Sequence, residues 1–391
     1  MTGATERPQG TGAGAPAPFV PPPYPYERLG RARSLAEAHP GGVVDLSVGT
    51  PGDPPPPAVV AALATSGAEA GYPPSLGSPA FREAASAYLA RRFGATVAPS
   101  AVAACVGTKE LVATLPQWLR LRRPERDTVL YPELSYPTYA MGATLAGCRA
   151  VPVPLSSEGL DLGRVSEADA GRALALWVNS PGNPTGALED LGAVAAWGRH
   201  RGIPVLSDEC YAEYTWAAPP RTVLSWGLEG VVAVHSLSKR SNLAGLRAGF
   251  YAGDPELVSY LGEVRKHAGL MVPGPVQAAA TVALGDDDHV VAQRARYRER
   301  LERCAAILAG VGLTAPLPAG SFYLWAQVAG TPGGNGAASP AWAWTEWLAD
   351  RGGLLVSPGD LYGPAGGERV RVAMVAPLDR LDLVARRLGV D

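Results

Sequence analysis

The sequence predicts an α/β fold built on a doubly wound, mostly parallel sheet. Short apolar runs alternate with segments of helical periodicity along most of the 391 residues, a pattern typical of strands separated by crossover helices. Polar residues of chemical interest follow directly after several of these runs, and ligands of such sheets bind beyond the carboxyl ends of the strands. A hydrophobic content of 47% with 18% charged residues supplies material for a sizeable core.

The individual elements can be placed in chain order. The composition of residues 1–24, rich in Pro, Gly and Ala, predicts a disordered tail, and residues 330–339 predict an exposed loop. We expect strands at 102–106, 128–131, 149–153, 174–179, 204–207, 231–235 and 249–252, and helices at 109–121, 138–146, 188–200 and 255–266.

Charge and cysteine usage narrow the class of protein. The net charge of −2 gives no general attraction to nucleic acid or to an anionic membrane, and no apolar run is long enough to span a bilayer. The four cysteines are scattered without ligand spacing, so we expect neither a disulfide framework nor a metal site. The amino-terminal segment does not have the pattern of a secretory signal peptide. These features predict a cytoplasmic protein.

Lysine is rare, which draws attention to each one. Only three of the 34 basic residues are lysine: Lys109, Lys239 and Lys266. Lys239 stands in the polar loop after the apolar run 231–235, where a lysine with a lowered pKa can form a Schiff base with a carbonyl. Ser236, Ser238 and Arg247 supply donors suited to a phosphate. A solvated loop with incidental charges remains the alternative.

Three other strand ends carry motifs. Asp208 and Tyr211, in SDECYAEY, could hold a ring nitrogen and a phenolate oxygen, or could be a helix cap and a packing residue. Asn183 lies in NSPGNPTG, whose prolines and glycines indicate a rigid, sharply turned loop. Gly107 and Thr108, in VGTKEL, lie where a helix start could cradle a phosphate or simply be capped.

Taken together and in this order, these motifs resemble the class I/II aminotransferases, the fold-type I enzymes that depend on pyridoxal 5′-phosphate. The resemblance runs from about Tyr24 to the C-terminus. It implies a large cofactor-binding domain of residues 50–285 and a smaller α+β domain formed by residues 25–49 and 286–391. It also implies a homodimer with shared active sites, acting on small amino and keto acids.

The resemblance assigns roles residue by residue. Lys239 matches the lysine that bonds the cofactor and moves the proton, Asp208 the carboxylate on the ring nitrogen, and Tyr211 and Asn183 the pair on the 3′-oxygen. Tyr136 matches the stacking aromatic, Arg371 the clamp for the substrate α-carboxylate, and Gly49 the glycine of the substrate-side loop. Gly107, Thr108, Lys109, Ser236, Ser238 and Arg247 match the phosphate cup, and Tyr72 a tyrosine that reaches the neighbouring subunit's phosphate. His235, Cys210 and Tyr323 are expected to pack rather than to react.

At a finer level, strings such as DLSVGTP, VHSLSKRSNLAG and SPGDLYGP look like actinobacterial succinyldiaminopimelate transaminases. These would exchange an amino group between glutamate and N-succinyl-2-amino-6-oxopimelate, so a cation for a distal carboxylate is needed. Two alternatives are weighed against this expectation. One is an enzyme of secondary metabolism that uses the same carbanion for elimination, replacement or carbon–carbon bond formation. The other is an effector-binding module of a transcription regulator, which would need a DNA-binding domain that the roughly 24 residues before the fold are too few to supply. Candidates for the distal cation are Arg31, Arg33, Arg265, Lys266 and the region of Asn242.

Overall fold

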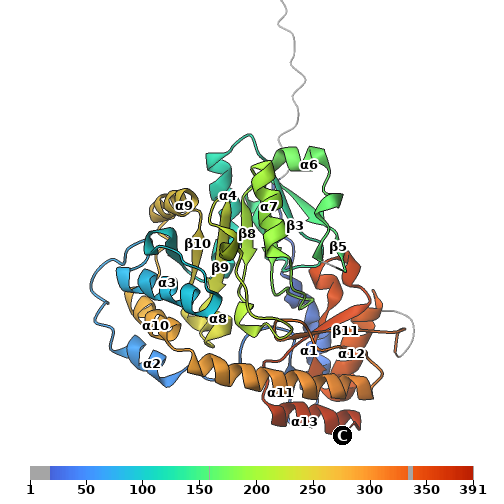
Figure 1. The fold of residues 1–391 in the computed structure, drawn as a ribbon. Helices are drawn as coiled ribbons and strands as arrows, with labels where there is room; N and C mark the ends of the chain where they lie inside the picture. The colour runs from blue at the N-terminus through green and yellow to red at the C-terminus, as the bar shows by residue number, and fades with distance from the viewer. Residues whose placement is uncertain (1–17, 158, 333–337, 391) are drawn as a thin grey trace, which may run out of the picture.

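A seven-stranded sheet forms the centre of the molecule (Figure 1). The computed structural model describes residues 18–157, 159–332 and 338–390. Residues 1–17 of the expected tail and 333–337 of the expected loop lie outside this range. β10 pairs antiparallel with β2 and β9, whereas the remaining pairs in the sheet are parallel. The order is β2 (Val102–Cys105), β10 (Gly249–Gly253), β9 (Val231–Ser236), β8 (Val205–Asp208), β7 (Ala173–Asn179), β3 (Thr128–Pro132) and β4 (Arg149–Val153).

The structure confirms the seven expected strands of this sheet, with ends within one residue of those expected. The four expected helices are also confirmed. The helix expected at 188–200 begins three residues later, because the Asp190 side chain accepts a hydrogen bond from the Ala193 N–H and caps the helix there. The helices on this sheet are α3 (Pro79–Phe93), α4 (Thr108–Arg122), α5 (Thr138–Leu145), α6 (Glu167–Arg172), α7 (Leu191–Arg201), α8 (Leu237–Arg240), α9 (Pro255–His267) and α10 (Gly274–Gly285).

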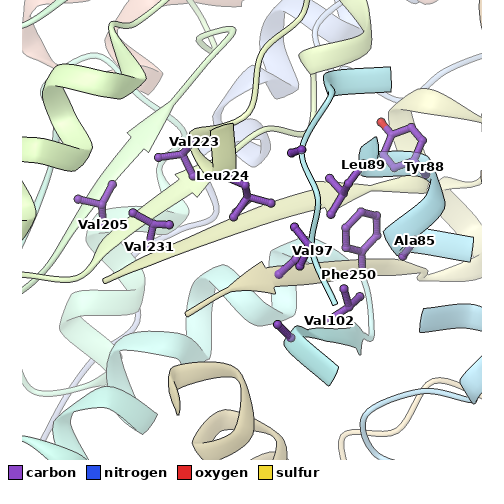
Figure 2. Close-up of a cluster of buried hydrophobic side chains, with 14 of the residues drawn as sticks. Ala85, Tyr88, Leu89, Val97, Val102, Val205, Val223, Leu224, Val231 and Phe250 are labelled. Carbon is purple, nitrogen blue, oxygen red and sulfur yellow. The ribbon is translucent and has the colours of Figure 1, made fainter. Parts of the chain in front are cut away.

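Helices cover both faces of the sheet, so successive residues of its strands enter different cores. In β9, Val231 and Ala233 pack with α3, α7 and α10, while Val232 and Val234 pack with α4, α5 and α9. Figure 2 shows part of the first core, where Phe250 of β10 lies beside Tyr88 and Leu89 of α3. This double burial leaves the strand ends as the places where polar groups can gather.

A second core surrounds a three-stranded sheet near the C-terminus. Its strands are β11 (Tyr323–Gln327), β14 (Arg369–Ala373) and β13 (Ser357–Pro358), with β14 in the middle and antiparallel to both neighbours. Figure 1 shows the long helix α11 (Asp288–Gly310) running beneath both parts of the molecule. The other helices here are α12 (Pro340–Gly352) and α13 (Leu378–Leu388).

The segment before residue 50 joins this second part. β1 (Val44–Asp45) pairs in parallel with β12 (Leu354–Leu355), and α1 (Gly30–Glu37) packs through Ala32 and Ala36 against Ala349 of α12. α2 (Pro57–Ala64) then leads into the larger part, where it packs on α10. The hairpin β5 (Leu155–Ser156) and β6 (Gly159–Leu160) lies between β4 and β7 in the sequence. This arrangement supports the expected division into two domains, which we keep as a proposal.

Candidate active site

The carboxyl edge of the seven-stranded sheet opens into a cavity of about 220 Å³. β7, β8 and β9 end at this edge, and β10, which runs the other way, begins there. The cavity brings together twelve of the residues expected at the site: Gly49, Thr108, Lys109, Tyr136, Asn183, Asp208, Tyr211, Ser236, Ser238, Lys239, Arg247 and Arg371.

Lys239 reaches the centre of this cavity from α8. Its Nζ donates a hydrogen bond to the carbonyl oxygen of Gly49, so the substrate-side loop and the lysine meet. The pKa of Lys239 is lowered to about 8, chiefly by burial. The positive charges of Arg371 and Arg247 act in the same direction, and Cys210 and Asp208 oppose them. A lysine amine that is partly neutral near pH 8 is a better nucleophile and base than an ordinary surface lysine.

Asp208 is a buried carboxyl group held from two sides. It ends β8, accepts a hydrogen bond of 2.7 Å from the Tyr139 hydroxyl, and accepts one of 3.1 Å from the Cys210 N–H. Burial raises the pKa of Asp208, while these hydrogen bonds oppose the rise. A buried carboxylate of this kind favours a positively charged group beside it in the cavity.

An anion cradle is formed where α4 begins. Gly107 precedes the helix with a φ of +73°, and a Cβ at this position would overlap the guanidinium of Arg247. The first N–H groups of α4 and the positive end of its dipole therefore lie close to a cation. Ser236 and Ser238 line the same cavity, and the Ser236 hydroxyl accepts a hydrogen bond from the Ser238 N–H.

Arg371 forms the opposite wall, from the middle strand β14 of the smaller sheet. It is 1% exposed, and its two terminal nitrogens donate to Asn183 Oδ1 at 2.8 Å and to the Ser47 carbonyl oxygen at 2.5 Å. The rings of Tyr323 and Tyr362 lie 4.3 and 4.7 Å from its guanidinium carbon. These contacts fix the plane of the guanidinium, which is the geometry needed to bind a carboxylate through two parallel hydrogen bonds.

Several residues of the cavity were missed or misjudged from the sequence. Tyr323, expected in the core, lines the cavity, and its hydroxyl lies 2.8 Å from that of Tyr211. Cys210 also lines it, with its thiol 3.4 Å from the Thr108 hydroxyl. Tyr24, placed in the expected tail, accepts a hydrogen bond of 2.9 Å from Lys109 Nζ. His235 packs as expected and stacks on Phe250.

Tyr72 and most of the residues named for a distal carboxylate lie outside the cavity. Tyr72 does not reach the cavity of its own chain: it is 98% exposed and lines a separate surface hollow with Pro73 and Gly274. Arg31, Arg33, Arg265 and Lys266, named as candidates for a distal carboxylate, do not line the cavity of this chain, whereas Ala244 from the region of Asn242 does. Arg265 is buried against Glu110, while Arg31, Arg33 and Lys266 pair with Glu346, Asp45 and Glu263, and Asn242 bonds to Pro54 and Gln293.

The cavity combines a buried lysine, a buried carboxylate and an anion cradle, a set of groups suited to an enzyme with a cofactor that carries a carbonyl and a phosphate. The chain belongs to the aminotransferase class I and II family, whose model matches residues 41–388. This family uses pyridoxal 5′-phosphate, and the residues present fit it, because the cavity offers an amine for its aldehyde, a carboxylate for its ring nitrogen and donors for its phosphate. When bound, the cofactor supplies the carbonyl that takes up the amino group and a ring that withdraws electrons.

Relatives along nearly the whole chain carry the same family name. The probable aminotransferase Rv1178 of Mycobacterium tuberculosis is 46% identical, over 94% of this chain and 85% of its own. OxyQ of Streptomyces rimosus, a 4-dedimethylamino-4-oxo-anhydrotetracycline transaminase, is 44% identical over 94% and 99%. An LL-diaminopimelate aminotransferase of Desulforudis audaxviator is 34% identical over 94% and 95%.

A solved structure agrees with these relatives. The probable N-succinyldiaminopimelate aminotransferase of Thermus thermophilus has a TM-score of 0.81 and 31% identity, and the match covers 93% of this chain and 98% of that one. This protein is therefore an aminotransferase that works with pyridoxal phosphate. None of the helices in the described ranges combines the length and the apolar character that crossing a membrane requires.

Proposed function

We propose that this aminotransferase moves an amino group between L-glutamate and 2-oxoglutarate on one side and a dicarboxylic amino or keto acid on the other. The observation that carries the proposal is the position of Arg371, a buried guanidinium that faces the same cavity as Lys239. An α-carboxylate bound to Arg371 orients the α-carbon of an amino acid toward the lysine amine. We put N-succinyl-LL-diaminopimelate first as the second substrate.

In this proposal the chain's own residues have distinct tasks. Lys239 Nζ would hold the cofactor and would move the proton at the substrate's α-carbon. Asp208, fixed by Tyr139, would keep the ring nitrogen protonated, while Tyr211 and Asn183 would bind the 3′-oxygen. Tyr136 would hold the ring, and Gly49 would bound the substrate side. The phosphate would be held by Gly107, Thr108, Lys109, Ser236, Ser238 and Arg247.

The distal carboxylate needs a cation at the mouth of the cavity. Lys239, Arg247 and Arg371 already have tasks, and Lys109 lines the same cavity with its ammonium group turned to the hydroxyl of Tyr24. We assign the distal carboxylate to the Lys109 side chain, while its backbone N–H remains part of the phosphate cup. The names of the D. audaxviator and T. thermophilus proteins support a substrate with a carboxylate at each end.

A second candidate rests on the 44% identity to OxyQ over nearly the whole of both chains. In that case the amino acceptor would be a ketone on a fused-ring metabolite. The rings of Tyr24 and Tyr26, which line the same cavity, offer flat apolar surface for such a molecule. Both candidates are transaminations, and the relatives' names favour this reaction over elimination or carbon–carbon bond formation.

We also propose a cytoplasmic homodimer with shared sites. Tyr72, exposed in the single chain beside an apolar hollow, would then reach the phosphate of the partner. Free Cys105, Cys148, Cys210 and Cys304 are consistent with a reducing compartment. Mixing Lys239→Ala chains with Tyr72→Phe chains tests the sharing, because hybrid dimers would regain one intact site. Activity of the mixture no higher than the sum of its parts would contradict it.

The substrate is tested by following each half-reaction separately. Purified enzyme is mixed with L-glutamate, with N-succinyl-LL-diaminopimelate and with an amine of a tetracyclic ring, and the change in cofactor absorbance is recorded. A rapid change with the first two compounds, reversed by 2-oxoglutarate, is expected. An absorbance change with glutamate and with the ring amine, but not with N-succinyl-LL-diaminopimelate, would favour the second candidate. No response to glutamate would contradict the proposed donor.

A further inference from the structure

Tyr24 and Tyr26 cross the mouth of the cavity from one part of the molecule to the other. We call Tyr24, Pro25 and Tyr26 the tyrosine strap. The Tyr24 hydroxyl accepts a hydrogen bond from Lys109 Nζ, whose ammonium also lies 4.4 Å from the centre of the Tyr24 ring. The Tyr26 hydroxyl lies 3.1 Å from the hydroxyl of Tyr362. Both tyrosines line the cavity.

The two ends of the strap are attached to different sheets. Lys109 belongs to α4, which follows β2 of the seven-stranded sheet, whereas Tyr362 ends the short 3₁₀ helix Gly359–Tyr362 after β13 of the smaller sheet. The Tyr362 ring is also one of the two that flank the Arg371 guanidinium. The strap therefore contacts the proposed distal cation directly and the proposed α-carboxylate clamp through Tyr362.

The two attachments differ in burial. Tyr24 is 44% exposed and Lys109 is exposed as well, so water competes for their hydrogen bond. Tyr362 is 3% exposed and Arg371 1%, so the Tyr26 attachment leads into the buried wall of the site. A neutral hydroxyl is a weaker partner for an ammonium group than a carboxylate is. The Tyr24 end can therefore be displaced by an anion, while the Tyr26 end holds.

We propose that Tyr24 and Tyr26 are specificity-determining residues with opposite effects. The Tyr24 hydroxyl keeps its hydrogen bond with Lys109 until a carboxylate at the far end of a substrate displaces the hydroxyl. Tyr24 therefore opposes the binding of dicarboxylic substrates. Tyr26 supports Tyr362 and through it Arg371, so it strengthens the binding of every substrate with an α-carboxylate. This inference rests on the proposed function for the role of Lys109.

The test compares carboxylates of different length as ligands of the holoenzyme, measured by calorimetric titration. Succinate, glutarate, adipate and pimelate probe both ends of the site, and butyrate and hexanoate probe Arg371 alone. Tyr24→Phe should tighten the binding of the dicarboxylates that reach Lys109 by about 5-fold, since one competing hydrogen bond is lost, and leave the monocarboxylates unchanged. Tyr26→Phe should weaken both groups of ligands by a similar factor.

A matched control removes a tyrosine hydroxyl far from the site. The Tyr260 hydroxyl donates to the Trp118 carbonyl oxygen at 2.8 Å, and Tyr260→Phe should change neither group of affinities. Tyr24→Phe that weakens dicarboxylate binding would make Tyr24 a direct ligand and overturn its assigned role. Tyr26→Phe that leaves the monocarboxylates unaffected would overturn the link from Tyr26 to Arg371.

One further variant separates this inference from the proposed function. If Lys109→Ala leaves dicarboxylate binding unchanged, the assignment of the distal carboxylate to Lys109 fails, and the role of Tyr24 fails with it. If Lys109→Ala weakens dicarboxylate binding but Tyr24→Phe has no effect, the assignment of Lys109 stands and only the role of Tyr24 is overturned. Turnover of N-succinyl-LL-diaminopimelate is not needed for either result.

Discussion

Arg371 and Asn183 meet in a buried hydrogen bond of 2.8 Å, although they are 188 positions apart in the chain. The bond joins the middle strand of the smaller sheet to the loop after β7 of the larger one. It therefore couples the proposed clamp for the substrate carboxylate to the proposed partner of the cofactor's 3′-oxygen. A substitution of either residue should therefore change the affinity for the substrate.

Arg371→Ala should impair the use of amino acids while leaving the cofactor bound. Removing one partner from a buried, hydrogen-bonded charge pair costs about 2–5 kcal/mol, which here should appear in kcat/KM for L-glutamate. The measurement is steady-state kinetics together with the affinity for pyridoxal phosphate. Loss of the cofactor in this variant would show that Arg371 is structural rather than a substrate ligand.

Lys239→Ala should abolish transamination while still binding pyridoxal phosphate without a covalent link. Proton transfer by a positioned side chain contributes about 10²- to 10⁴-fold to a rate, and here the attachment point is lost as well. Lys266→Ala is the matched control, because that lysine is exposed and paired with Glu263. Borohydride reduction followed by peptide mapping should label the Lys239 peptide, and labelling at Lys109 or Lys266 would contradict the assignment.

The covalent loading of cofactor-free protein should follow the pKa of Lys239, which burial lowers to about 8. Only the neutral amine attacks a carbonyl, so the loading rate should rise with pH up to about 8 and then level off. Arg371→Met should move the plateau to higher pH, because it removes a positive charge that favours the neutral amine. A rate in the unchanged protein that keeps rising toward 10.5, the ordinary lysine value, would contradict the lowered pKa.

Gly107→Ala should weaken cofactor binding more than its effect on folding explains. A Cβ there meets the Arg247 guanidinium, and the φ of +73° with a ψ of 148° lies close to a region adopted essentially by glycine alone, which costs another residue about 1–3 kcal/mol. Gly227→Ala is the control, since its φ of 99° and ψ of 158° lie in the same region and a Cβ there makes only an ordinary contact with Arg199. Both variants should lose similar thermal stability without cofactor, and only Gly107→Ala should lose affinity. Equal losses of cofactor affinity in the two variants would show that Gly107 is not part of the anion cradle.

The elements of the larger sheet follow from apolar periodicity, because strands buried on both faces are continuous apolar runs with polar residues at their ends. That is why Asp208, Lys239 and Asn183 could be placed from the sequence. The antiparallel direction of β10 could not be, since an apolar run has no signature of direction. It emerges only from the pairing with β2 and β9.

The missed residues have a common cause. Tyr136 precedes α5 and Tyr139 is the second residue of that helix, with the two rings 5.9 Å apart. The nearness of the two tyrosines in the sequence was an available signal for the contact of Tyr139 with Asp208. Tyr323 lies in a buried strand, so its sequence context indicates only packing. Tyr24 follows a run of prolines, and its contact with Lys109 depends on the tertiary fold. Side chains that reach a site from a distant segment leave little local trace.

The reversed course of β10 also has a mechanical consequence. The chain leaves the edge of the sheet after Ser236 and returns to it just after Arg247, so one short loop carries Ser236, Ser238, Lys239 and Arg247. The part of the anion cradle formed by Ser236, Ser238 and Arg247 is thus attached to the same loop as the reactive amine. A rotation of the smaller sheet against the larger one would move Arg371 relative to Lys239, but would leave the spacing between the amine and the cradle unchanged. Such a motion could therefore change how the substrate approaches the lysine amine, but not where the cofactor binds.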